Sequence, residues 1–200
     1  MLVRTALNGA LIAALLLPSS LIAQPIEDPN WPCVQRKVTG LSVGLMWPHP
    51  LPDSEISTAQ SELADALALR RVSLADAESL VADFMQANPE TDLDDLGLIF
   101  EGVFDHLAKE RRKIMAGIER YASGQHALSQ RIDQNRMAFR KAEASEPPDY
   151  DRLDELEAKI DWDERIFRDR AQSLTYVCET PVLLERRLYA IAQMLLNSAP

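Results

Sequence analysis

Apolar residues recur at seven-residue intervals along two stretches in the second half of the chain. The interval holds through Leu93–Leu128 and again through Leu153–Leu195. A seven-residue repeat sustained over more than three repeats is typical of α-helices that pair in a coiled coil. Because Pro147 and Pro148 separate the stretches, the pattern predicts two long helices folded back on each other as an antiparallel hairpin.

The second stretch contains Pro181, which lacks a backbone donor and crowds the preceding helical turn. One interpretation is a kink in a continuous helix. The other is a short break after which Thr180 caps a final helix that begins at Pro181. We expect the break, and therefore helices over residues 92–144, 150–178 and 181–197.

The segment before the hairpin predicts a pair of short helices, over residues 54–70 and 74–87. Ser73 followed by Asp76 is typical of a helix N-terminus, and Asn88 followed by Pro89 ends the second apolar pattern. Residues 24–52 hold six prolines and are therefore expected to be extended and to lie across the helices. The predicted fold class is all-α, a long coiled-coil hairpin packed with this short helix pair, in one helical bundle over residues 53–200.

Residues 1–23 have the pattern of a secretory signal peptide. Arg4 precedes an apolar run over Ala6–Leu17, and small residues follow up to Ala23. The apolar run has about 12 residues, whereas a membrane-spanning helix needs about 20. We therefore expect cleavage after Ala23, export to the periplasm or the outside of the cell, and no stable membrane span after cleavage.

Cys33 and Cys178 are the only cysteines. In an oxidising compartment two cysteines are expected to form a disulfide. A bridge between residues 145 positions apart is expected to stabilise the fold, since it restricts the unfolded chain. The sequence contains no Cys-x-x-Cys pair, which favours a structural bridge over a redox function.

The chain has 31 acidic and 21 basic side chains, a formal net charge of −10. Such a surface repels the phosphate backbone of nucleic acids and anionic lipid headgroups. We therefore expect no nucleic-acid partner.

Charged residues at the helix seam predict two polar layers. When the two series are aligned about the Pro-Pro turn, Arg131 lies opposite Asp163, and Glu110 lies at the level of Glu185, where it is expected to pair with Arg186 or Arg187. Arg170 is a further charged residue of the seam. Charge-assisted hydrogen bonds would satisfy these side chains, which are expected to fix the register of the hairpin. A ligand-binding carboxylate is the alternative interpretation.

Large aromatic residues and small residues suggest two further kinds of site. Tryptophans are favoured as interface anchors, and small residues within a helical bundle can line a cavity. The candidate contact residues are Trp31, Trp47, Trp162 and Tyr189, and the candidate cavity residues are Gly117, Tyr121, Gly124, Arg170 and Tyr176.

The sequence contains none of the common metal, nucleotide or hydrolase motifs. Met46 and His49 are two copper-compatible ligands in a proline-rich loop, too few for a site. We expect no cofactor and a non-enzymatic accessory protein whose partner is another envelope protein or a second copy of this chain. The alternative hypothesis is a helical bundle that binds a small molecule or cofactor in its core.

Overall fold

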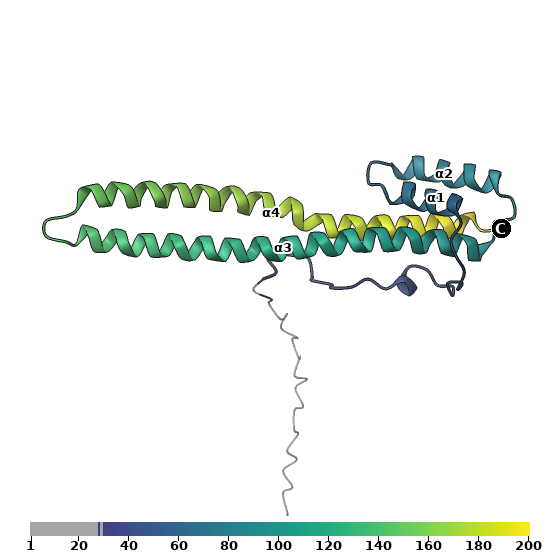
Figure 1. Ribbon diagram of the computed structural model, residues 1–200, viewed down its shortest axis with the longest axis horizontal. Helices are drawn as coiled ribbons and strands as arrows, with labels where there is room; N and C mark the ends of the chain where they lie inside the picture. The colour runs from purple at the N-terminus through teal and green to yellow at the C-terminus, as the bar shows by residue number, and fades with distance from the viewer. Residues whose placement is uncertain (1–27, 29) are drawn as a thin grey trace, which may run out of the picture.

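The computed structural model describes residue 28 and residues 30–200. The expected signal segment, residues 1–23, lies outside the described residues. Within the described part every regular element is helical, which confirms the predicted class (Figure 1). The elements are the short 3₁₀ helix η1 (Val43–Leu45), α1 (Thr58–Ala68), α2 (Leu74–Ala87), α3 (Leu93–Glu143) and α4 (Tyr150–Ser198).

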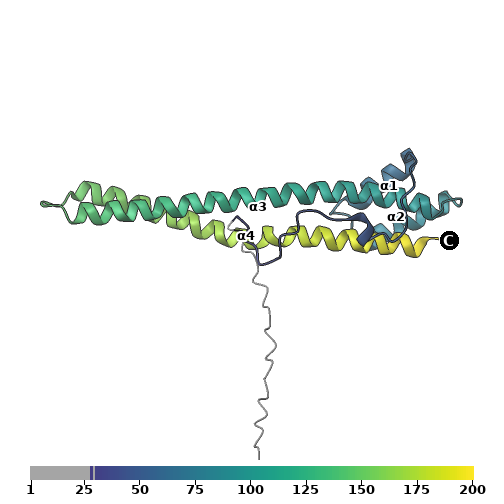
Figure 2. The same ribbon diagram turned by 90° about the horizontal axis from the view of Figure 1, so that it is seen from below.

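Helices α3 and α4 form the predicted antiparallel hairpin and lie side by side along their length (Figures 1 and 2). At 1.5 Å per residue each helix is about 75 Å long. Two hydrogen bonds across the seam report its register, from Tyr121 Oη to the Arg170 carbonyl oxygen at 2.8 Å and from Gln125 Nε2 to the Phe167 carbonyl oxygen at 3.1 Å. The tip is the short turn through Pro147 and Pro148.

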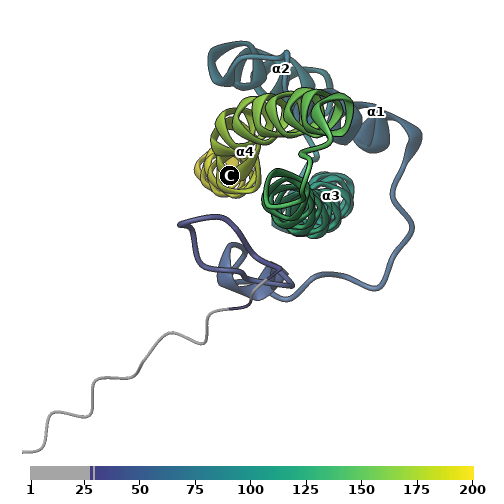
Figure 3. The ribbon, with the colours of Figure 1, turned by 90° about the vertical axis from the view of Figure 1, so that its left-hand side faces the viewer.

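The apolar core lies at the end of the hairpin away from the tip. Helices α1 and α2 cover one side of α3 and α4 there, close to the C-terminus (Figures 1 and 3). Leu67, Ile99, Phe100, Leu107, Leu188 and Ile191 are fully buried in this cluster. We call this end the base, and the part of the hairpin over residues 120–176 the distal arm.

Helix α1 begins at Thr58, four residues later than predicted. Ser57 Oγ accepts a hydrogen bond from the Gln60 amide at 3.3 Å, and Gln60 Oε1 accepts one from the Ser57 amide at 2.7 Å. This reciprocal cap satisfies two donors at the helix start, whereas the expected start near Ser54 has no such partner in the sequence. Helix α2 has the predicted bounds, with Ser73 as its cap.

Helix α4 continues through Pro181, so the predicted break after residue 178 is wrong. Pro181 is itself buried, and the neighbouring Cys178 and Leu184 are buried on the same helix. Packing on both sides therefore offsets the loss of one backbone hydrogen bond. Figure 1 shows the path of α4 displaced part-way along its length, in agreement with the kink interpretation.

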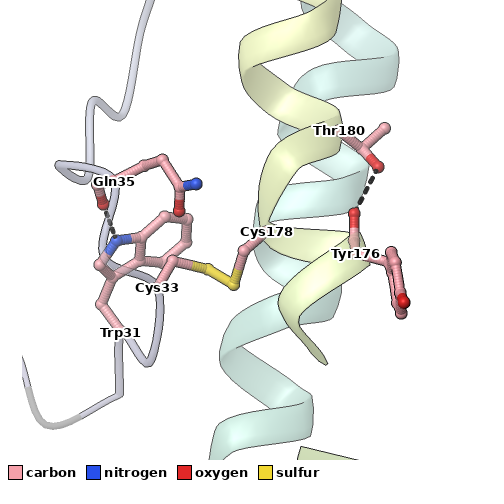
Figure 4. Close-up of a disulfide and its surroundings, with 6 residues drawn as sticks. All are labelled: Trp31, Cys33, Gln35, Tyr176, Cys178 and Thr180. Atoms are coloured by element: carbon pink, nitrogen blue, oxygen red, sulfur yellow. Dashed lines mark hydrogen bonds between the residues drawn. A yellow bond between two sulfur atoms is a disulfide. The ribbon is translucent and has the colours of Figure 1, made fainter. Parts of the chain in front are cut away.

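Residues 30–57, which we call the strap, run along the hairpin on the side opposite α1 and α2 (Figure 3). The predicted disulfide joins Cys33 in the strap to Cys178 in α4, with the two Cα atoms 5.5 Å apart (Figure 4). Lys37 Nζ lies 2.7 Å from Glu119 Oε1 in α3 and provides a second attachment. The strap is extended apart from η1, as its prolines predicted.

Candidate functional site

A charged pair joins the two helices of the distal arm. Arg131 Nε donates to Asp163 Oδ2 at 2.7 Å, and Arg131 Nη2 donates to Asp163 Oδ1 at 2.6 Å. The Asp163 residue is 6% exposed, and the hydrogen bonds from Arg131 hold the pKa of its carboxyl below the usual range. The expected pair is therefore present, and its two-pronged geometry favours one alignment of α3 against α4.

The second polar layer differs from the predicted one. Arg111, which is 2% exposed, donates from Nε to Glu185 Oε1 at 2.7 Å and from Nη2 to the Val38 carbonyl oxygen at 2.7 Å. Glu110 instead lies 3.5 Å from Arg70 Nη1, so its predicted pairing across the hairpin is wrong. The reason is rotational, because Arg111 is turned into the seam and Glu110 is turned toward the end of α1. The buried arginine thus joins α3, α4 and the strap.

Arg186 and Arg187 have separate environments. Arg187 donates from Nε and Nη2 to the Leu67 carbonyl oxygen, at 3.0 and 2.7 Å, and from Nη1 to the Val72 carbonyl oxygen at 2.8 Å. It therefore satisfies one acceptor in the last turn of α1 and one in the turn between α1 and α2. Burial lowers the pKa of the Arg187 guanidinium. Arg186 is exposed, and neither of the two arginines forms the expected pair with Glu110.

Trp47 belongs to the core and is therefore not available as a contact residue. It is 1% exposed and stacks on Phe100, with ring centroids 5.3 Å apart. A Cβ atom built on Gly97 would lie 3.4 Å from the indole ring, so this glycine leaves room for the tryptophan. Trp31 is half-buried beside the disulfide, and its indole nitrogen donates to the Gln35 carbonyl oxygen at 2.6 Å (Figure 4).

Trp162 differs from the other two tryptophans, because it is 62% exposed on the distal arm. A surface hollow of about 640 Å³ lies on one side of it, and one of about 420 Å³ lies on the other. The first hollow extends onto α3 and contains the Arg131–Asp163 pair. The second is lined by Ala158, Asp161, Arg165 and Arg168. An exposed indole therefore stands between two depressions with mixed charge.

The candidate cavity residues do not enclose a space together. Tyr176 is 73% exposed, and Gly124 is exposed with no atom within 4 Å of an added Cβ atom. At Gly117 the nearest such atom is Arg120 Nη2, at 3.9 Å. Tyr121 is partly buried, which raises the pKa of its hydroxyl. Neither glycine is therefore packed closely against another part of the described chain.

Within residues 28 and 30–200, no three His, Cys, Asp or Glu side chains are placed to hold a metal ion together. The same part of the chain holds no helix with the length and apolar character that crossing a membrane requires. No protein family model, no curated protein sequence and no solved structure matches the chain.

Three contacts were missed when only the sequence was considered, namely the hydrogen bonds of Arg111, the capping by Arg187 and the attachment of Lys37. Each depends on the route of the strap or on the position of α1. The repeated Glu-Arg-Arg tripeptides at 110–112 and 185–187 were the available signal. They do meet at one level of the hairpin, and the side chains that pair are Arg111 and Glu185.

Proposed function

We propose that this protein is an exported, non-enzymatic accessory protein that binds another protein of the cell envelope through its distal arm. The observation that carries the proposal is Trp162, a large aromatic side chain that is 62% exposed on the part of the hairpin beyond the strap attachments. Exposed tryptophans are typical anchors of protein interfaces.

The disulfide supports a location outside the cytosol. Cys33 and Cys178 are bonded, and disulfides persist in oxidising compartments and are rare in the cytosol. A bonded pair is compatible with an extracellular or periplasmic location. The signal-like residues 1–23 favour export in addition, so we assign the protein to the periplasm or the outside of the cell.

The geometry of the distal arm supports a docking role. Helices α1 and α2 pack at the base and leave the distal arm as two helices (Figure 1). At 1.5 Å per residue, α4 extends about 42 Å from Cys178 to its start at Tyr150. The Arg131–Asp163 pair restrains the hairpin next to Trp162, which limits the ordering cost of binding. The hollows on both sides of Trp162 offer room for side chains of a partner.

The test compares Trp162→Ser with Tyr189→Ser in the tagged full chain. Tyr189 is a matched control, because it is 56% exposed on the same helix but lies at the base. A specific partner recovered from the envelope fraction should be lost from Trp162→Ser and kept by Tyr189→Ser. Untagged wild-type protein should compete for that partner, whereas untagged Trp162→Ser should not.

Equal recovery of the same proteins by both variants would overturn the proposed docking site. Sedimentation of the purified protein shows whether the chain forms a dimer, which distinguishes self-association from binding to a different protein. A dimer that dissociates in Trp162→Ser would overturn the proposal in favour of self-association. A monomeric wild-type protein with a Trp162-dependent partner would support it.

A further inference from the structure

An apolar pocket surrounded by arginines lies where the turn between α1 and α2 meets α4. Its volume is about 310 Å³, and it opens to the surface at the base, well away from Trp162. The lining residues are Arg70, Leu74, Leu183, Leu184, Arg186 and Arg187. The pocket therefore combines aliphatic side chains with three cationic ones on a protein whose net charge is −10.

The leucines form an apolar surface that faces water. Leu184 is 1% exposed, and Leu74 and Leu183 are 44% and 51% exposed. Covering exposed apolar area of this kind with an apolar ligand removes it from water and is therefore favourable. A short aliphatic chain lying against Leu74 and Leu183 would cover both.

Two of the three arginines, Arg186 and Arg187, carry positive charge that no ion pair within the described part of the chain neutralises. No carboxylate of the described residues forms an ion pair with Arg186 or Arg187, and Arg70 reaches only Glu110, at 3.5 Å. Arg187 is held in place by its hydrogen bonds to the carbonyl oxygens of Leu67 and Val72. Its pKa is lowered by burial, so a nearby anion would stabilise its charged form.

We propose that this pocket binds a carboxylate carried on a short aliphatic chain, with Arg186 and Arg70 binding the carboxylate and Leu74 and Leu183 the chain. The planar guanidinium group matches the two oxygens of a carboxylate. A volume of about 310 Å³ is at the small end of the range of small-molecule sites, which fits a short aliphatic chain rather than a bulky ligand.

The test is calorimetric titration of the full, oxidised chain with octanoate. Octanol, which has the chain without the charge, and acetate, which has the charge without the chain, should each bind much more weakly. Arg186→Gln should weaken octanoate binding about tenfold or more, since it removes a charged donor from the carboxylate. Leu183→Ser should also weaken it, because the chain loses an apolar wall.

Two controls separate this site from other effects. Arg165→Gln removes an exposed arginine on the distal arm and should leave octanoate affinity unchanged. Trp162→Ser should also leave it unchanged, so the outcome is independent of the proposed docking function. Circular dichroism of each variant confirms that the helices form.

Three results would overturn the proposal. These are no heat of binding for octanoate, equal affinity for octanol, or octanoate binding that Arg186→Gln does not change. The same titration with a peptide that ends in Leu-Leu and has a free C-terminal carboxylate tests a second possible ligand. Peptide binding without octanoate binding would replace a free fatty acid with a polypeptide terminus as the occupant and overturn the proposal in its stated form.

Discussion

Removing the disulfide is the perturbation whose cost can be worked out most directly. In the Cys33→Ser, Cys178→Ser double variant the folded chain keeps other attachments of the strap, including Lys37 to Glu119 and the Arg111 bond to the Val38 carbonyl oxygen. The folded state should therefore change little. The main effect should be on the unfolded chain, which gains the freedom that the bridge had removed.

The chain-entropy relation gives the size of this effect. The bridge closes a loop of 145 residues, for which the relation gives about 5 kcal/mol at 25 °C. Residual structure in the unfolded chain reduces the gain in freedom. We expect the double variant to lose ~2–4 kcal/mol of unfolding free energy.

Urea unfolding followed by circular dichroism measures the loss. The slope of the free energy against urea should also rise in the double variant, because its unfolded chain exposes more surface. Reductant should lower the stability of the wild-type protein toward that of the double variant and leave the double variant unchanged. A loss below about 0.5 kcal/mol would refute the reasoning, since the predicted entropy term is several times larger.

Three further changes test the packing and the charged pair. Gly124→Ala should raise the free energy of unfolding in urea by about 0.5–1 kcal/mol, because residue 124 is helical and has open space around it. Gly102→Ala should not raise it, because the added Cβ atom would lie 3.0 Å from a side chain of α1. Trp47→Ala should lower the free energy of unfolding by about 3–5 kcal/mol. Trp47→Phe should lower it far less, because the buried indole nitrogen has no acceptor among the described residues and its loss breaks no hydrogen bond. Equal losses in the two variants would contradict this. The lowered pKa of Asp163 means that the Arg131 bond stabilises the folded state above 3.8, the ordinary pKa of the carboxyl, and that this stabilisation is lost as the pH falls toward the lowered value. The stability difference between wild type and Asp163→Asn should therefore shrink as the pH falls below 3.8, and a constant difference would contradict the assignment.

The hairpin could be predicted because the pattern of apolar residues that specifies it is repeated many times along the sequence. A seven-residue rhythm persists over many turns of α3 and α4, and aligning the two series about the Pro-Pro turn placed Arg131 opposite Asp163 correctly. The same alignment gave the level of the second polar layer. It did not give the rotation of α3 about its own axis there, which decides whether Glu110 or Arg111 turns inward.

The course of the strap could not be predicted, because extended proline-rich segments carry no periodicity. Trp47 was therefore expected at an interface, although it lies in the core against Phe100. A usable signal was present in α3, where Gly97 lies one helical turn before Phe100 on the same face and leaves space for a large ring. The pocket at the base was also missed, because Arg70 and Arg186 come from segments that only the packing of α1 brings together.

Pro181 lies three residues after Cys178, in the part of α4 from which the distal arm extends. Proline leaves the Val177 carbonyl oxygen without its usual helical donor, so this turn of α4 has one backbone hydrogen bond fewer than its neighbours. The segment from residue 178 back to residue 150 is a lever of about 42 Å at 1.5 Å per residue, and a change of about 10° at the proline would swing its end by about 7 Å. The covalent bond to Cys33 attaches the strap three residues from this proline, so the strap holds α4 at the turn where a small bend would move the tip most.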